Sequence, residues 1–355
     1  MSRFVQLHLL TTYPPSNPNR DDLGRPKTAR FGNAERMRIS SQALKRAIRT
    51  SESFREALAG HMGQRTQRIG RIIHDRLLEK GADEERAMEI ARKVADVFGK
   101  VKKEKADRPL DLEQLAFVSP EERERALEWA ERMLAGEDPD DNTLKKEILR
   151  HADGAADIAM FGRMLADDPH YNREAAVQIA HAITTNRVEV ESDFYTAVDD
   201  LKVPEEDAGA GFVGELGFGS GVFYIYACVD RDLLMENLGG DERLASAALG
   251  ALVHALATSS PGGKKNSFAH GGRAQYILVE KGNQQPRTLA AAFLKPVHDE
   301  DLMRASIERL EKFREEMGAA YGACADEVRI MRVGTPQSAT LEDIAGFCAS
   351  AVGGA

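Results

Sequence analysis

Cations and hydroxyls cluster at the predicted start of a helix. Ser40 and Ser41 can each cap the helix that an amphipathic pattern predicts over residues 41–58. A helix N-terminus has unpaired backbone N–H groups and a partial positive charge, so cations one or two turns further on would complete a phosphate-binding site, called the phosphate seat below. The predicted polar face carries Gln42, Lys45, Arg46 and Arg49, with no acid among them. This favours phosphate contact over the alternative, a capped helix whose charged face is merely solvated.

A second basic cluster lies in the glycine-flanked segment 261–273. Lys264, Lys265 and Arg273 could meet phosphates there, while the glycines let the backbone approach a nucleic-acid strand. The segment lacks the GxxxxGK[ST] spacing of a nucleoside-triphosphate loop. A flexible surface loop is nearly as good an interpretation of this sequence.

Three apolar side chains could contact bases. Met164 follows Phe161-Gly162-Arg163, and Phe194-Tyr195 begins a segment rich in Asp, Glu and Gly. Methionine and aromatic side chains can wedge between bases or stack on them, but they more often fill a core. From the local sequence, core packing is therefore the favoured interpretation.

Few groups in the chain could be catalytic. His181 and His254 are predicted as core positions, and neither an HExxH motif nor a metal-ligand spacing of His and Cys occurs. Asp21-Asp22 beside Arg20 is the one carboxylate pair in a basic loop, where a metal-assisted nuclease role is conceivable. A loop salt bridge or a turn is the favoured interpretation. We therefore expect no catalytic residue, metal or cofactor.

The composition is typical of a folded cytoplasmic protein. The 355 residues are 42% hydrophobic and 30% charged, which leaves room for two or three packed units. The three cysteines are too widely spaced for a disulfide framework or a zinc finger. Residues 1–10 predict a strand without a cleavage site, and no run approaches the roughly 18 apolar residues of a membrane span.

Charge is segregated along the chain. The net charge is −9, yet residues 1–50 carry +7 and residues 261–297 carry +5. Segregation of this kind is expected of a protein that touches phosphate along one track. A chance surface bias is the alternative.

Periodicity predicts the elements that would hold these residues. Outside a helical block over 64–150, the order strand, helix, strands, helix, strand fits an α+β ferredoxin-like arrangement, a fold that often binds RNA on its sheet face. The predicted strands cover 1–10, 155–164, 177–185, 222–228 and 275–280, and the later helices cover 119–134 and 241–258. Residues 12–38 are predicted as a loop, and 119–122 as a capping box with proline at the first helical position.

These residues, taken in order, resemble the CasC family, the backbone subunit of the type I-E CRISPR Cascade complex. The resemblance extends over essentially the whole chain. It rests on Asn19-Arg20-Asp21-Asp22, Arg38 to Gln42 with Leu44-Lys45-Arg46, Gly162-Arg163-Met164, Ala180 to Thr185, Phe194 to Asp200, and Phe223-Tyr224.

The resemblance implies a hand-shaped architecture. An RRM-like palm would take residues 1–60, 153–188 and 222–355, helical fingers would take 61–152, and a protruding thumb would take 189–221. Ser40, Gln42 and Lys45 would hold the RNA backbone with Arg49, and Arg20 and Lys27 would line the same groove. Met164 would be a wedge at a displaced nucleotide, and Phe194-Tyr195 would pack near the base of the thumb.

The function that the resemblance implies is that of a non-catalytic scaffold. Copies of the chain would polymerise along CRISPR RNA, bind other Cascade subunits, and present the guide for pairing with target DNA. Two alternatives remain. One is an RNA-cleaving backbone subunit of the type III kind that uses Asp22, and the other is a stand-alone small-molecule enzyme of this fold, which would be a monomer without affinity for RNA.

Overall fold

The computed structural model describes residues 2–165, 168–197 and 212–350, and the chain divides into two compact units. Unit 1 comprises residues 1–54, 179–228 and 250–351, and unit 2 comprises 55–178, 229–249 and 352–355. The strands are β1 (Phe4–Ser16), β2 (Thr28–Phe31), β3 (Ala34–Ile39), β4 (Gln64–Thr66), β5 (Ala116–Val118), β6 (Val177–Ile179), β7 (Ala182–Thr184), β8 (Glu191–Ala197), β9 (Phe212–Asp230), β10 (Ala274–Gly282) and β11 (Glu327–Arg332).

The α-helices and short 3-10 helices fall between these strands. The α-helices are α1 (Ser41–Thr50), α2 (Glu52–Ala57), α3 (Ile69–Glu79), α4 (Glu84–Ala95), α5 (Pro120–Leu134), α6 (Asp141–Ile148), α7 (Ala156–Phe161), α8 (Arg231–Asn237), α9 (Glu242–Thr258), α10 (Lys265–Phe268), α11 (Leu302–Tyr321) and α12 (Leu341–Ala349). The 3-10 helices are η1 (Asp96–Phe98), η2 (Pro169–Tyr171) and η3 (Ala290–Phe293). None of the helices in the described part of the chain is long and apolar enough to span a membrane.

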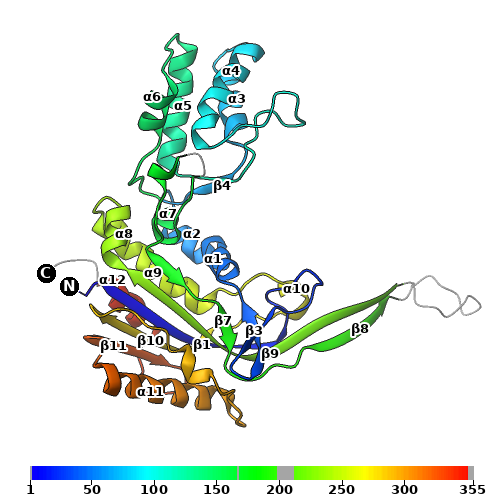
Figure 1. The fold of residues 1–355 in the computed structure, drawn as a ribbon, viewed down its shortest axis with the longest axis vertical. Helices are drawn as coiled ribbons and strands as arrows, with labels where there is room; N and C mark the ends of the chain where they lie inside the picture. The colour runs from blue at the N-terminus through cyan, green and yellow to red at the C-terminus, as the bar shows by residue number, and fades with distance from the viewer. Residues whose placement is uncertain (1, 166–167, 198–211, 351–355) are drawn as a thin grey trace, which may run out of the picture. The chain divides into compact units, whose positions relative to one another are not determined.

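Unit 1 is built on a large sheet with the strand order β11-β10-β1-β9-β7-β3-β2. The pairings of β1 with β10 and of β7 with β9 are antiparallel. Helix α1 follows β1, and α9 lies between β9 and β10, so β1, β7, β9 and β10 follow the predicted strand–helix–strand–strand–helix–strand order (Figure 1). The predicted α+β class is confirmed.

The central strands of this sheet are buried on both faces. Tyr224 and Leu278 pack with Phe293 and Leu310, so η3 and α11 cover one face (Figure 1). On the other face, the Lys281 ammonium lies 3.8 Å from the ring centroid of Phe347 in α12. The common use of this fold, RNA binding on an open sheet face, is therefore not available to the central strands. The predicted RNA binding would therefore have to use loops, helix ends and sheet edges of unit 1.

A buried ionic cluster joins three elements of unit 1 on the α11 side of the sheet. Glu280 is 1% exposed, and it accepts hydrogen bonds from Arg287 at 2.5 Å and Arg314 at 2.6 Å. The His8 ring lies 3.4 Å from the same carboxylate and 2.8 Å from the Tyr224 hydroxyl. Burial opposes the charged form of Glu280, but the hydrogen bonds from His8 and the two arginines outweigh it and lower the pKa.

We expect this lowered pKa to make unit 1 sensitive to acid. A carboxylate whose pKa is lower in the folded state stabilises the fold above its unfolded pKa and loses that contribution as pH falls. Between pH 7 and pH 4 the wild type should lose about 1 kcal/mol more unfolding free energy than Glu280→Gln, which is the less stable protein at pH 7. Urea titrations of both proteins at the two pH values measure this difference. Parallel pH profiles would contradict it.

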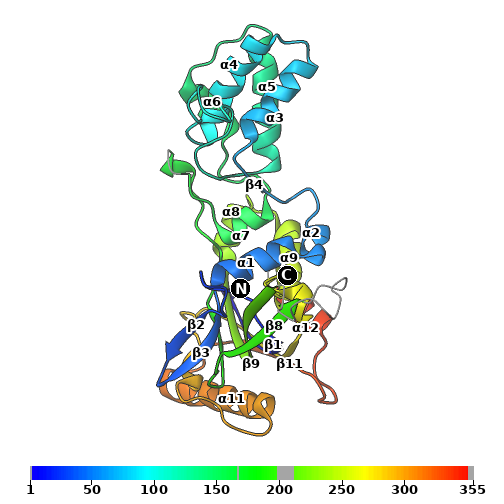
Figure 2. The same cartoon turned by 90° about the vertical axis from the view of Figure 1, so that its right-hand side faces the viewer.

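The apolar core of unit 2 is built by helices α3 to α6 together with a small hairpin, β4–β5 (Figure 2). Ile69, Ile73 and Leu77 recur at i, i+4 on α3, so they share one face, which packs into the apolar core with Val94 and Trp129. Helix α5 begins as predicted: the Glu122 N–H donates to Ser119 Oγ at 3.1 Å, and the Ser119 N–H donates to the Glu122 carboxylate at 3.1 Å.

Three predicted elements are wrong. Residues 155–164 are not a strand, because 156–161 form α7, a helix that ends at Gly162 with a φ of +79°. The predicted loop 12–38 contains the end of β1 and the β2–β3 hairpin, whose Gly32-Asn33 turn is a recognisable signal that was missed.

The predicted helix 41–58 breaks into α1 and α2 at Ser51. The Ser51 backbone N–H and hydroxyl both donate to the Ile48 carbonyl and end α1 there. A polar side chain that bonds to a nearby carbonyl thus competes with continuation of the helix.

The predicted thumb contains a two-stranded ribbon. Strand β8 pairs with β9 from Glu191 opposite Phe218 to Ala197 opposite Phe212, and Figure 1 shows the pair extending from the sheet. Residues 198–211 of the predicted thumb, with the Val198-Asp199-Asp200 end of its motif, lie outside the described residues.

Candidate nucleic-acid interface

The start of α1 is fixed by the preceding loop. Ser40 Oγ accepts the Ala43 N–H at 3.2 Å, as predicted for an N-cap, and the Ser40 N–H donates to the Asn19 side chain at 2.8 Å. The Asn19 carbonyl accepts the Lys27 N–H at 2.7 Å. Asn19 therefore ties the loop that carries Arg20 and Lys27 to the helix N-terminus.

A groove of about 1020 Å³ lies on one side of α1, entirely within unit 1. Three of the predicted cations, Arg20, Arg46 and Lys265, line it. Its other lining residues come from the same three stretches of chain, 18–24, 43–52 and 258–265. The structure thus brings together Arg20 and Lys265, which lie 245 positions apart in the sequence.

The predicted polar face of α1 borders the groove along one edge. The groove is lined by Ala43, Arg46, Ala47 and Thr50, whereas Gln42, Lys45 and Arg49 do not line it. At about 100° per residue, Gln42, Lys45, Arg46 and Arg49 fall within one arc of about 100°, and Arg46 lies at the edge of that arc nearest the groove. Arg46 therefore shares the predicted polar face with Gln42, Lys45 and Arg49, and it is the one of these four side chains that lines the groove.

A further basic cluster lies where β3 meets β7. The Arg38 guanidinium lies 2.7 Å from His181 Nδ1, and the neighbouring strand residues Arg38 and Ile183 are paired in the sheet. Desolvation, together with the positive charges of Arg38 and Lys27, lowers the pKa of His181. His181 is exposed and His254 is half-buried, so the prediction that both are core residues is wrong.

Arg36 is a buried structural residue whose role the sequence analysis did not predict. Its side chain is fully buried and donates to the carbonyls of Thr184, Thr185 and Phe293 at 2.9, 2.7 and 2.7 Å. Burial lowers the pKa of this guanidinium. Arg36 therefore fixes β3, the strand that leads into Ser40, to β7 and η3.

The segment 261–273 is an ordered part of the groove wall rather than a plain loop. It contains the short helix α10, flanked by Lys264 and Ala269 with φ values of 50° and 48°. A Cβ added at Gly263 would lie 2.3 Å from the Pro18 carbonyl oxygen, whereas one added at Gly262 would meet nothing within 4 Å. Only glycine allows this approach of residue 263 to Pro18. Lys264 does not line the groove, whereas Lys265 does.

We predict different outcomes for alanine at these two adjacent glycines. Gly263→Ala should lower the unfolding free energy by about 1–3 kcal/mol because the backbone of residue 18 must move, and should weaken RNA binding by displacing Lys265. Gly262→Ala should change the stability by less than about 0.5 kcal/mol. Thermal unfolding and RNA titration of both variants measure the contrast. Equal losses of stability in the two variants would contradict the close approach of Gly263 to the Pro18 carbonyl.

The three apolar candidates are exposed, not core. Met164 is 79% exposed, Phe194 is 70% exposed and Tyr195 is 46% exposed. A Cβ on Gly214, opposite Tyr195 in β9, would lie 2.4 Å from the Tyr195 ring, so that ring lies over a glycine across the ribbon. Core packing, the interpretation favoured from the local sequence, is thus wrong for all three.

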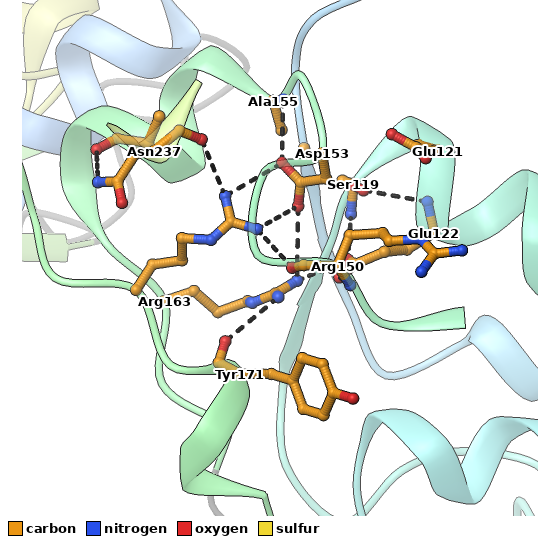
Figure 3. Close-up of polar contacts among 12 residues, drawn as sticks. Ser119, Glu121, Glu122, Arg150, Asp153, Ala155, Arg163, Tyr171 and Asn237 are labelled. Atoms are coloured by element: carbon orange, nitrogen blue, oxygen red, sulfur yellow. Dashed lines mark hydrogen bonds and ion pairs between the residues drawn. The ribbon is translucent and has the colours of Figure 1, made fainter. Parts of the chain in front are cut away.

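Met164 lies in unit 2. The residue before it, Arg163, belongs to a network of buried ion pairs (Figure 3). The Arg163 guanidinium contacts the Glu122 carboxylate at 2.5 Å, with both side chains fully buried. Arg173, paired with Arg163 through two backbone hydrogen bonds, contacts Asp153 at 3.3 Å. Burial lowers the pKa of Arg173. The residue before Met164 is therefore locked, while Met164 itself points to solvent.

The acidic pair of the basic loop forms a turn. Asp21 Oδ1 accepts the backbone N–H groups of Leu23 and Arg25, both at 2.9 Å, in the manner of an Asx turn. Asp22 is exposed and lines the groove. Within the described residues, no group of three or more His, Cys, Asp or Glu side chains is placed to hold a metal ion.

The fold and these residues define an α+β protein with a helical insertion and a cation-lined groove. The chain belongs to the CT1975-like protein family, whose model matches residues 5–346. It is also similar to a chain from a "CRISPR RNA-guided surveillance complex, pre-nicking", with 29% identity and a TM-score of 0.85, covering 98% of this chain and 100% of that one. A second similar chain, from a "CRISPR RNA-guided surveillance complex", has 25% identity and a TM-score of 0.70, with 98% of each chain covered. No curated protein matches significantly.

Proposed function

We propose that the chain is a CasC-type backbone subunit of a type I-E Cascade complex, a non-catalytic cytoplasmic scaffold that polymerises along CRISPR RNA and presents the guide to target DNA. The observation that carries this proposal is the end-to-end similarity to a chain of a CRISPR RNA-guided surveillance complex, 29% identical with all of that chain covered. In this assignment unit 1 supplies most of the palm and the β8–β9 thumb ribbon, and helices α3 to α6 of unit 2 belong to the fingers, residues 61–152.

The RNA backbone would be held by cations and polar groups along α1 and in the two loops beside it. Lys27, Ser40, Gln42, Lys45 and Arg49 form one set, and Arg20, Arg46 and Lys265 line the groove, with Lys264 beside them. Cations and backbone N–H groups bind phosphate oxygens without reading bases. The proposed seat would therefore accept any guide sequence.

The exposed apolar residues would act on the bases. A methionine at 79% exposure on a segment locked by buried ion pairs suits a wedge at a displaced nucleotide, and Phe194 and Tyr195 offer exposed rings near the base of the thumb. Base displacement costs stacking energy, which contacts between the wedge and the neighbouring bases can offset, and the anchored segment before Met164 limits the backbone entropy that is lost on binding.

RNA binding by the purified full-length chain tests this proposal. Single-stranded RNAs of equal length and unrelated sequence should bind with affinities that agree within a few-fold in fluorescence anisotropy, and all should weaken steeply with salt. A strong sequence preference, or binding to none of the RNAs, would contradict it.

A second candidate is an RNA-cleaving backbone subunit of the type III kind. The observation that favours it is that Asp22 lines the same groove as Arg20, Arg46 and Lys265. Cleavage of RNA complementary to the guide, measured in the assembled complex with Mg²⁺, separates the two. A scaffold leaves the RNA intact, whereas a nuclease cuts it and loses activity with Asp22→Ala.

A further inference from the structure

Residues 100–108 of unit 2 form a basic loop that the proposed RNA seat does not include. The loop carries Lys100, Lys102, Lys103, Lys105 and Arg108 against Glu104 and Asp107. Its net charge is +3, in a chain whose net charge is −9. Figure 1 shows the segment between α4 and β5, at the cyan to teal part of the colour scale, leaving the helices of unit 2.

The two ends of the loop are anchored firmly. Val101 and Leu112 are buried and paired in an isolated bridge, and the Lys102 N–H donates to the Asp111 carbonyl at 2.9 Å. The Arg92 guanidinium donates to the Lys102 carbonyl at 2.9 Å and to the Pro109 carbonyl. Anchoring lowers the conformational entropy that the loop would lose on binding a partner.

The loop holds its cations out to solvent. Lys103 and Lys105 are exposed, and neither ammonium has an acid within ion-pair distance in the described part of the chain. Lys100 is 68% exposed and lies 3.4 Å from Glu113. Arg108 is 56% exposed, 3.6 Å from the almost fully exposed Asp107. Exposed pairs of this kind contribute little energy, so they can be exchanged for contacts to phosphate.

The composition of the loop indicates which form of nucleic acid it fits. Proteins that bind single strands combine cations with aromatic rings on which unpaired bases stack, whereas a duplex offers phosphates outside and keeps its bases inside. Residues 99–109 contain no aromatic side chain. The loop can therefore neutralise phosphates, but it has no ring for an unpaired base.

We propose that the loop 100–108 binds the phosphate backbone of double-stranded DNA without reading its sequence. The choice of DNA rests on the proposed function, in which the complex must meet a duplex before the guide pairs with one strand. Each lysine that contacts a phosphate would add to the salt dependence of duplex binding, because it releases condensed counterions.

The test compares two double variants of the full-length chain. Lys103→Gln/Lys105→Gln removes the two exposed lysines of the loop. Lys80→Gln/Lys93→Gln is the matched control, because it makes the same charge change in unit 2 at lysines already paired with Glu131 at 3.0 Å and Asp138 at 2.8 Å. Anisotropy of a labelled DNA duplex unrelated to the guide, and of a single-stranded RNA, is measured with each protein at several salt concentrations. The RNA-free chain and the RNA-loaded chain are both titrated.

Duplex affinity of the loop variant should fall about tenfold, and the log–log salt slope should fall by about 1.8, with single-stranded RNA binding unchanged. Three results would overturn the proposal. The loop variant could bind the duplex as tightly as the wild type, the control variant could lose as much duplex affinity as the loop variant, or the loop variant could lose as much affinity for single-stranded RNA as for the duplex. A chain that binds no RNA at all would contradict the proposed function, yet its duplex titration would still decide the role of the loop. An unchanged unfolding transition of Trp129 fluorescence shows that the loop variant is folded.

Discussion

Replacing Arg163 with methionine should lower the unfolding free energy of unit 2 by about 3–5 kcal/mol. The substitution leaves the Glu122 carboxylate, which is 0% exposed, without the guanidinium that lies 2.5 Å away. Glu122 also completes the capping box of α5, so the loss would reach a helix that carries part of the unit 2 core. Breaking one side of a buried ion pair costs more than the pair itself contributes, because an uncompensated charge stays behind.

Trp129 makes this measurement specific to unit 2. It is the only tryptophan in the chain and it lies in the unit 2 core, so its fluorescence during denaturation reports this unit. Arg125→Met is the matched control, because Arg125 pairs with Glu121 at 2.8 Å on the partly exposed side of the same helix. It should cost less than about 1 kcal/mol. Similar unfolding midpoints for the two variants would contradict the claim that the buried ion pair stabilises unit 2 more than the exposed one.

Replacing Lys45 and Arg49 together with glutamine should weaken RNA binding by about tenfold for each cation that contacts a phosphate. The log–log salt slope should fall by about 0.7 for each lost contact with a single strand. Since phosphate carries no sequence information, the loss should be the same for every RNA. Anisotropy titrations at several salt concentrations with unrelated RNAs measure all three features.

Lys312→Gln is the control for this pair. Lys312 lies on α11 of unit 1, is 77% exposed, and is only loosely paired with Glu316 at 3.9 Å. The Lys312→Gln variant should have the RNA affinity and the log–log salt slope of the wild type. A sequence-dependent loss in the double variant would point to base contacts at α1 rather than a phosphate seat.

Local signals in the sequence predicted the features that depend on neighbouring residues. Ser40 caps α1 and Ser119 begins a capping box, because both bond to backbone N–H groups three residues on. The prediction of a strand over 155–164 was wrong because a short apolar stretch fits a strand or a helix equally well. Contacts with residues far along the chain, such as that of the Asp157 carboxylate with the Gly63 N–H, favour the helix α7.

Features that depend on distant residues could not be predicted from local pattern. The groove beside Arg46 could not be predicted, because its other walls come from 18–24 and 258–265, far from α1 in the sequence. Arg36 and Arg163 are charged residues of a type that is mostly exposed. Both are buried because each has a partner far along the chain: Glu122 is 41 positions from Arg163, and Phe293 is 257 positions from Arg36. The exposure of Met164 and Phe194 likewise depends on which surfaces the tertiary fold leaves uncovered.

The mass of the protein–RNA species as a function of RNA length tests the central claim most directly. Size-exclusion chromatography with light scattering and absorbance at two wavelengths gives the protein and RNA content of each species. A backbone scaffold predicts that the number of chains per RNA rises in proportion to RNA length. A single chain per RNA at every length, or a monomer that ignores RNA even when co-expressed with a CRISPR transcript, would contradict the account.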